Sequence, residues 1–215
     1  MKKHALLFIL LAVNAIVFAD KGLIVTQKYN TGKDGQHVTV TWYITDTQCK
    51  LKMVFSDKDV NTTTYFIPDV KRNQLLSYSD APVPAGMQKT YYGIPVGNIK
   101  ADAANRVVVE RTSETKTISG VICDKVISKI GNTSTEIWVT KEFNANFYMF
   151  AQFFKSSNEL KALSEGKING FPLSSVTKDP NGKVVNGYEL ISVSSTEISD
   201  TEFAVPSDYK IAGSK

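Results

Sequence analysis

The feature that most constrains the fold is a series of short runs in which apolar and polar residues alternate. Residues 37–44 are His-Val-Thr-Val-Thr-Trp-Tyr-Ile, and residues 49–53 are Cys-Lys-Leu-Lys-Met. A period of two is typical of a strand that buries one face, because successive side chains of a strand point to opposite faces. These runs are rich in Val, Ile, Thr, Tyr and Phe, which strands favour. The sequence therefore predicts a mainly β domain.

Residues 79–102 depart from this pattern. Prolines and glycines interrupt them repeatedly, although they also carry apolar side chains. This composition predicts a long loop that packs on the body or serves as a lid. Elsewhere the alternation predicts strands over residues 23–29, 37–44, 49–55, 62–67, 73–78, 106–110, 115–118, 120–130, 133–140, 173–178 and 183–194.

One helical insertion interrupts the strands. Residues 145–154 are Ala-Asn-Phe-Tyr-Met-Phe-Ala-Gln-Phe-Phe, which is apolar nearly all round, and residues 159–164 predict a second short helix. A helix of the first kind must be covered on most sides. It is either a core helix on the inner face of a curved sheet or a flexible plug over an apolar cavity. In the second interpretation the ligand-binding residues are Phe147, Met149, Phe150 and Phe154.

The first nineteen residues predict export. Lys2 and Lys3 precede an apolar run over residues 5–18, and Ala19 ends a sequence suited to signal peptidase. The apolar run is shorter than the roughly 20 residues that cross a bilayer. We expect cleavage near Ala19-Asp20 and a periplasmic or secreted product.

Charge and hydropathy restrict the partners of the remaining domain, residues 20–215. The full chain carries a net charge of +4, and removal of the two signal-peptide lysines lowers it by two. A nearly neutral chain without a basic cluster is not typical of a nucleic-acid-binding protein. No second apolar run reaches spanning length, so we expect a single soluble domain and not an integral membrane protein.

The search for catalytic and metal-binding residues returns no candidate. His37 is the only histidine outside the predicted signal peptide, and the chain has no Gly-x-Ser-x-Gly sequence. Two distant cysteines and one histidine lack the short spacing of a zinc site. The sequence therefore predicts no catalytic residues, no metal and no cofactor. Paired carboxylates have no local signature, so a hydrolase with scattered carboxylates remains an alternative.

Cys49 and Cys123 leave two interpretations open. In an oxidising compartment they could form a disulfide, worth roughly 4 kcal/mol for a loop of about 75 residues. Alternatively, both are buried thiols that behave as small apolar side chains. Two cysteines are too few for a disulfide framework, and we favour the second interpretation.

Three segments, over residues 117–125, 135–140 and 203–210, resemble a family of small exported proteins, the domain of unknown function 4412. The matching patterns are Gly120-x-x-Cys123-x-Lys125, Glu136-x-Trp138-Val139-Thr140 and Phe203-x-x-Pro206-x-x-Tyr209-Lys210. The layout is also similar to that of the LolA-like carriers of outer-membrane lipoproteins. Cys123 matches a family cysteine, whereas Cys49 lies in no matching motif.

The resemblance implies an antiparallel curved sheet, an open half-barrel whose concave side is covered by one or two helices. It implies no catalytic residues. By analogy alone it suggests a non-enzymatic binding or carrier protein of the cell envelope, with a lipid, a lipoprotein or another apolar ligand. The alternatives are the hydrolase above and a structural or interaction module that presents a sheet edge to a partner.

Overall fold

The computed structural model describes residues 19–30, 37–57, 60–96, 106–140, 147–154 and 158–212. Residues 1–18 of the expected signal peptide lie outside this description. The strands are β1 (Ala19–Asn30), β2 (His37–Ile44), β3 (Cys49–Asp57), β4 (Val60–Asp69), β5 (Gln74–Ser79), β6 (Thr90–Pro95), β7 (Val107–Ile118), β8 (Val121–Ile130), β9 (Thr133–Thr140), β10 (Pro172–Lys178), β11 (Val184–Ser199) and β12 (Lys210–Ile211). The helices are α1 (Phe147–Ala151), the 3₁₀ turn η2 (Gln152–Phe154), α2 (Asn158–Gly166) and the 3₁₀ turn η3 (Asp200–Phe203).

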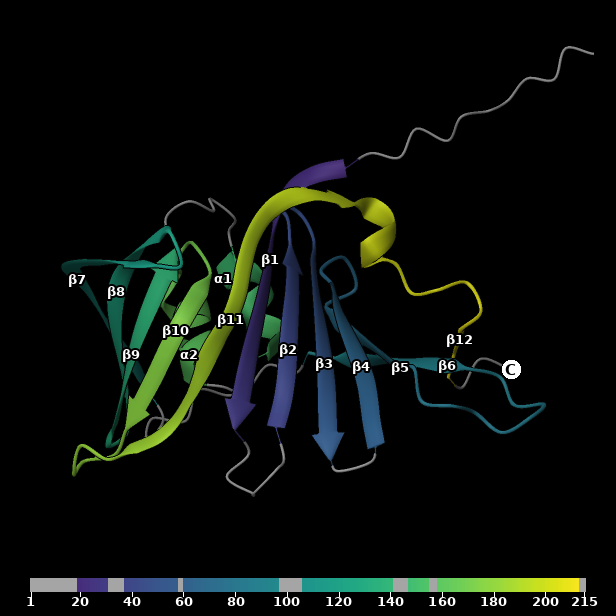
Figure 1. The fold of residues 1–215 in the computed structure, drawn as a ribbon, viewed down its shortest axis with the longest axis horizontal. Helices are drawn as coiled ribbons and strands as arrows, with labels where there is room; N and C mark the ends of the chain where they lie inside the picture. The colour runs from purple at the N-terminus through teal and green to yellow at the C-terminus, as the bar shows by residue number, and fades with distance from the viewer. Residues whose placement is uncertain are drawn as a thin grey trace, which may run out of the picture.

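The twelve strands of the described ranges belong to one sheet, in the order β12-β6-β5-β4-β3-β2-β1-β11-β10-β9-β8-β7. Neighbours are antiparallel except β12, which pairs with β6 in parallel through Lys210 and Ile211. The sheet curves without closing, so that β7 and β12 form its two ends (Figure 1). The open curved sheet expected from the resemblance is confirmed.

The helices α1 and α2 lie on one side of this sheet, behind β9 to β1 in Figure 1. They pack into the main core, where the Trp42 ring makes edge contacts with Phe147, Phe154 and Phe171 at centroid distances of 5.6, 5.1 and 5.6 Å. Such edge-to-face pairs add to the gain from burying apolar area. The predicted covering of the concave side by short helices is therefore confirmed.

The predicted loop over residues 79–102 was wrong in part, because strand β6 lies inside it. Residues 97–102 of this prediction lie outside the described ranges. Tyr92 pairs with Ser77 and Ile94 with Leu75. The Pro and Gly residues of this segment are uncommon in strands, so the sequence predicted a loop here. A Cβ atom at Gly93 would lie 2.6 Å from the side-chain oxygen of Gln74, so a larger residue there would require the Gln74 side chain to move.

Two further predictions differ from the structure in detail. The strands expected over 106–110 and 115–118 form one strand, β7, whose register is irregular between Arg111 and Thr115. The helix expected over 145–154 is divided into α1 and η2, and its first two residues lie outside the described ranges.

The last described segment of the chain, residues 200–212, lies against outward-facing side chains of β3 and β5 and pairs with β6; it is here named the C-terminal strap. The Tyr209 ring packs on Tyr78 at 5.0 Å, and its hydroxyl donates a hydrogen bond to the carbonyl oxygen of Ser79 at 2.9 Å. The Lys50 ammonium, in a largely buried side chain, contacts the Glu202 carboxylate at 2.9 Å. The strap therefore supplies an aromatic partner for Tyr78 and an acidic partner for Lys50, whose side chains point outward from the sheet.

Both cysteines are buried in the main core, Cys49 in β3 and Cys123 in β8, and the structure shows them as two separate thiols. Burial raises the pKa of the Cys49 thiol well above its ordinary value. A thiol in such surroundings is unreactive and packs as a small apolar group.

Candidate functional site

An apolar groove of about 700 Å³ lies between the inner face of β1–β6 and the helical segment. The six strands form its floor, and η2 with the start of α2 forms its wall. Its size falls within the usual range for pockets that hold small molecules. The lining residues are Tyr29, Val38, Val40, Trp42, Leu51, Met53, Phe66, Leu75, Ile94, Pro95, Val96, Gln152, Phe153, Phe154, Glu159 and Leu160.

Strand register explains why the floor is continuous. Val40 on β2 is the direct partner of Met53 on β3, and Leu51 on β3 is the partner of Phe66 on β4. Directly opposed residues lie on the same face of a sheet. Each strand therefore contributes one to three apolar residues to a surface that crosses six strands.

The groove has a buried side and an exposed side. Phe153 and Phe154 in the wall are only 7% and 8% exposed, and the Trp42 ring packs against Phe154. Ile94 on β6, by contrast, is 47% exposed although it lines the same groove. The helices therefore leave the β5–β6 end of the floor open to solvent.

Polar groups occur at the β1 end of the groove. Tyr29 donates a hydrogen bond from its hydroxyl to the Gln27 side chain at 3.3 Å, and Glu159 on α2 is 3% exposed. Burial, and secondly the charge of Glu159, raises the pKa of Tyr29. Of the groove residues that the structure describes, these two are the ionisable ones.

Of the four residues predicted from the helical pattern, only one lies in the groove. Phe154 lines the groove, whereas Phe147 and Phe150 are buried in the core and Met149 is 40% exposed outside the groove. The core interpretation therefore fits Phe147 and Phe150. Sequence reasoning missed the floor residues, which were visible only as the apolar faces of separate strands.

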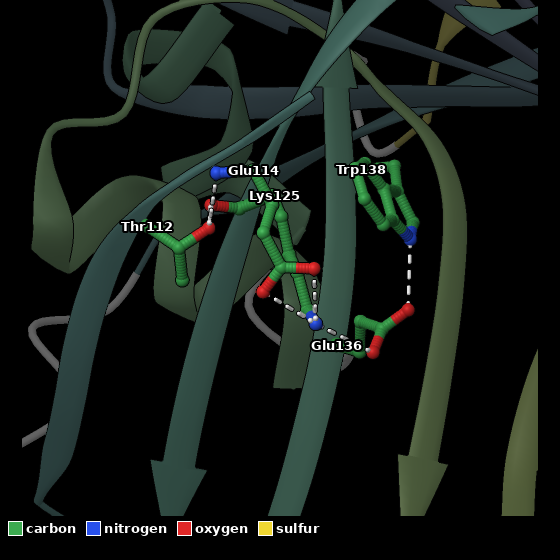
Figure 2. Close-up of polar contacts among 5 residues, drawn as sticks. All are labelled: Thr112, Glu114, Lys125, Glu136 and Trp138. Carbon is green, nitrogen blue, oxygen red and sulfur yellow. Dashed lines mark hydrogen bonds and ion pairs between the residues drawn. The ribbon is translucent and has the colours of Figure 1, made fainter. Parts of the chain in front are cut away.

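A second cluster of side chains brings together two motifs of the family resemblance, on β7, β8 and β9 (Figure 2). The Lys125 ammonium lies 3.1 Å from Glu114 and 3.4 Å from Glu136. The Trp138 indole N–H donates a hydrogen bond to Glu136 at 2.8 Å. Lys125 and Trp138 are direct cross-strand partners. The motif residues thus connect three neighbouring strands.

The electrostatic interactions in this cluster favour the charged forms of Glu136 and Lys125. Burial acts to raise the pKa of Glu136, but the Trp138 hydrogen bond and the Lys125 charge outweigh it and hold the pKa below its ordinary value. The hydrogen bond to Glu114, with the charge of Glu136, raises the pKa of Lys125. The cluster contains no activated nucleophile, and its geometry is that of an ion pair network between strands.

A smaller polar cavity of about 360 Å³ adjoins this network near Arg111, Asp124 and Asn169. The Arg111 guanidinium donates hydrogen bonds to the carbonyl oxygens of Gly166 and Lys167 at 3.4 and 3.3 Å, at the end of α2. Within the described ranges, no three His, Cys, Asp or Glu side chains form a group suited to a metal ion. No helix in the described part of the chain is long and apolar enough to span a membrane.

Solved structures with a similar fold have low sequence identity to the chain. An uncharacterised conserved protein from Thermus thermophilus is 10% identical, with a TM-score of 0.50 and 90% of each chain covered. PNGF-II is 16% identical with a TM-score of 0.43, covering 90% of this chain and 31% of that one. MucB in complex with MucA(peri) is 10% identical with a TM-score of 0.46, covering 87% of this chain and 55% of that one.

No curated protein sequence matches the chain significantly. The family model, however, matches residues 23–209, which span nearly the whole of the described sheet and include all three resembling patterns except the final Lys210. The chain belongs to the family defined by the domain of unknown function DUF4412.

Proposed function

We propose that this protein is an exported, non-enzymatic binding or carrier protein that holds a lipid or another apolar ligand in the groove over β1–β6. The observation that carries the proposal is the apolar floor, which crosses six strands and remains exposed at Ile94. Isolated apolar residues on a surface need no explanation, but a continuous concave apolar surface is typical of a ligand site.

The energetics of acyl-chain binding agree with such a groove. Burial of one methylene gains about 0.8 kcal/mol, so twelve methylenes gain about 10 kcal/mol. Association costs at least about 4 kcal/mol in lost translational and rotational freedom. The difference is at most about 6 kcal/mol, which corresponds to a dissociation constant no tighter than tens of micromolar. Apolar contact alone can therefore give reversible binding, as a carrier requires.

The proposed location follows from the predicted signal peptide. Cleavage after Ala19 would release a chain that begins at Asp20 into the periplasm or the medium. Such a compartment contains lipids and lipoproteins that need shielding from water. An exported product that retains Met1 would contradict this part of the proposal.

The groove is tested by titration with N-phenyl-1-naphthylamine, an uncharged apolar dye that fluoresces in apolar surroundings. We expect saturable binding by the wild type and at least about tenfold weaker binding by Ile94→Lys, because the lysine brings a charge into the apolar site. Ile94 is 47% exposed, so the substitution should leave the fold intact.

The matched control is Ile122→Lys on β8, where the isoleucine is 50% exposed and lies outside the groove. We expect its affinity to remain within about twofold of the wild type, since surface substitutions have small effects. A wild type without saturable binding, or equal losses in the two variants, would refute the assignment of the groove.

A further inference from the structure

The floor of the groove becomes more exposed from β2 toward β6. On β2 and β3 the most buried lining residues, Trp42 and Leu51, are almost inaccessible to solvent. The lining residues Phe66 on β4 and Leu75 on β5 are half-buried. Ile94 on β6 is 47% exposed. The β6 end is therefore the entrance through which a long molecule can reach the buried floor.

A pair of tyrosines closes the groove at the β1 end. Of the β1 residues that the structure describes, only Tyr29 lines the groove, and its cross-strand partner on β11 is Tyr188. The two rings pack at a centroid distance of 4.9 Å. Tyr188 lies behind Tyr29 and outside the lining, and its hydroxyl donates a hydrogen bond to the carbonyl oxygen of Pro172 at 2.9 Å. The Tyr29–Tyr188 pair is here named the end wall.

Hydrogen bonds determine which part of Tyr29 is left for a ligand. The Tyr29 hydroxyl donates to the side-chain oxygen of Gln27, which is 1% exposed and lies outside the groove lining. The same oxygen accepts a hydrogen bond from the Trp42 indole at 3.2 Å. Because the hydroxyl has this buried partner, the Tyr29 ring is what remains for contact with a ligand. A methyl end suits such a surface, whereas a charged head group would lose its hydration there.

We propose that the groove takes amphiphiles with a long acyl or alkyl chain, which enter methyl end first and stop at the end wall, while the polar head remains in solvent beside Ile94. This inference rests on the proposed function and adds the ligand class, its orientation and the residue pair that limits chain length. Neighbouring strands lie about 4.8 Å apart, so the floor from β1 to β6 is roughly 24 Å long along its curve. The groove therefore distinguishes ligands by their chains and not by their head groups.

Quenching of Trp42 fluorescence by spin-labelled stearate measures the orientation. The nitroxide is placed either next to the carboxylate or near the methyl end, so the two probes share one chain and one head group. In a Trp138→Phe background only Trp42 emits, because the chain has two tryptophans. The methyl-end label should lie roughly 5 Å from Trp42 and the carboxylate-end label roughly 19 Å away, by strand spacing, so we expect at least about threefold stronger quenching by the methyl-end label.

A fluorophore at the entrance should show the opposite order. Ile94→Cys accepts a thiol-reactive bimane dye there, since Cys49 and Cys123 are buried. We expect the carboxylate-end label to quench this dye more strongly than the methyl-end label. The matched control is bimane on Ile122→Cys, because Ile122 is 50% exposed and lies outside the groove. There the two probes should quench equally.

A series of saturated fatty acids of increasing length tests the end wall by displacement of N-phenyl-1-naphthylamine. In the wild type we expect the affinity to rise about fourfold with each added methylene until the chain fills the floor, and then to level off. Tyr29→Ala removes the ring and should move this limit to a longer chain. Tyr92→Ala is the control, because Tyr92 is 58% exposed outside the groove lining. It should keep the wild-type limit.

The outcomes separate this inference from the proposed function. If stearate binds but the methyl-end label does not quench Trp42 more strongly, the orientation is wrong and the apolar groove stands. A folded Tyr29→Ala variant with the wild-type limit would overturn the role of the end wall. If neither the dye nor any fatty acid binds, the proposed function itself fails. The Trp42 measurement leaves Tyr29 in place, so it decides the orientation even if Tyr29→Ala does not fold.

Discussion

At the scale of single residues, the ion pair network of β7–β9 shows how the family motifs stabilise the sheet. Lys125 contacts two carboxylates, and Glu136 also accepts the Trp138 hydrogen bond. Exposed ion pairs contribute little one by one, but a shared lysine and an indole donor restrict the geometry of the whole group. We therefore interpret these motif residues as structural.

This network should make stability depend on pH in the acid range. The pKa of Glu136 is below its ordinary value of 4.5 in the folded protein, so its stabilising effect is present above that value and is lost as the pH falls through the folded pKa. Glu136→Gln keeps an acceptor for Trp138 but removes the charge. We expect its deficit in unfolding free energy to be largest near neutral pH and to shrink in acid.

Urea unfolding of both proteins from neutral to strongly acid pH measures this deficit. Glu110→Gln, at an exposed position on β7, is the control for the loss of a carboxylate. A deficit for Glu136→Gln that stays constant across the acid range would contradict the assignment.

The helix α1 carries a core residue and an exposed residue at adjacent positions. Phe150 is 4% exposed and its neighbour Met149 is 40% exposed. We expect Phe150→Ala to lower the unfolding free energy by about 3–5 kcal/mol, through lost transfer energy and a new cavity. Met149→Ala should cost less than about 1 kcal/mol. Denaturant melts of the two variants measure the difference, and equal costs would show that the helix packs differently.

At the scale of elements, most strands followed from the alternation of residues. Strand β2 has the predicted bounds, because its face pattern is uninterrupted between turn residues. Strand β6 was not predicted, because Gly93 and Pro95 interrupt its short sequence with residues that are uncommon in strands. The irregular register near Arg111 was also hidden, because a sequence pattern does not show which residues oppose one another across strands.

The alternation of residues predicted no strand in the C-terminal strap, but the strap contains the family pattern that runs from Phe203 to Lys210. Its Tyr209 is 7% exposed and donates to the carbonyl oxygen of Ser79. We expect Tyr209→Phe to cost about 1 kcal/mol, the usual value of one hydrogen bond. It should also speed hydrogen exchange at the amides of Lys210 and Ala212, which bond to Lys89 and Tyr91.

Tyr92→Phe provides the control for this substitution. Tyr92 lies on β6 beside the strap and is 58% exposed. Its change should alter neither stability nor exchange measurably. Unchanged exchange at both strap amides in Tyr209→Phe would show that Tyr209 does not hold the strap.

At the scale of the whole molecule, the groove is a property that no single segment contains. The sequence identified Phe154 as a candidate and indicated the inward side of several strands. It did not indicate that the helices would cover only part of the concave face. That outcome depends on the strand order, in which β1 pairs with β11 and thereby joins the two halves of the chain. Long-range pairing of this kind has no local signature.

The whole molecule should therefore respond to a ligand in the groove. A ligand that binds only the folded state at a concentration equal to its dissociation constant stabilises by about 0.4 kcal/mol. For a domain of this size that corresponds to a rise in Tm of roughly 1–2 °C. We expect dodecanol to produce this rise in the wild type and in Ile122→Lys but not in Ile94→Lys.

The tryptophans supply an independent measurement of dodecanol binding. Trp42 lines the groove, whereas Trp138 does not. In a Trp138→Phe background, the remaining fluorescence comes from Trp42, because the chain has two tryptophans. Dodecanol should change this emission with the concentration dependence of the Tm shift, since the indole lies beside the bound chain. A Tm shift without a change at Trp42, or an equal shift in Ile94→Lys, would place the ligand elsewhere on the molecule.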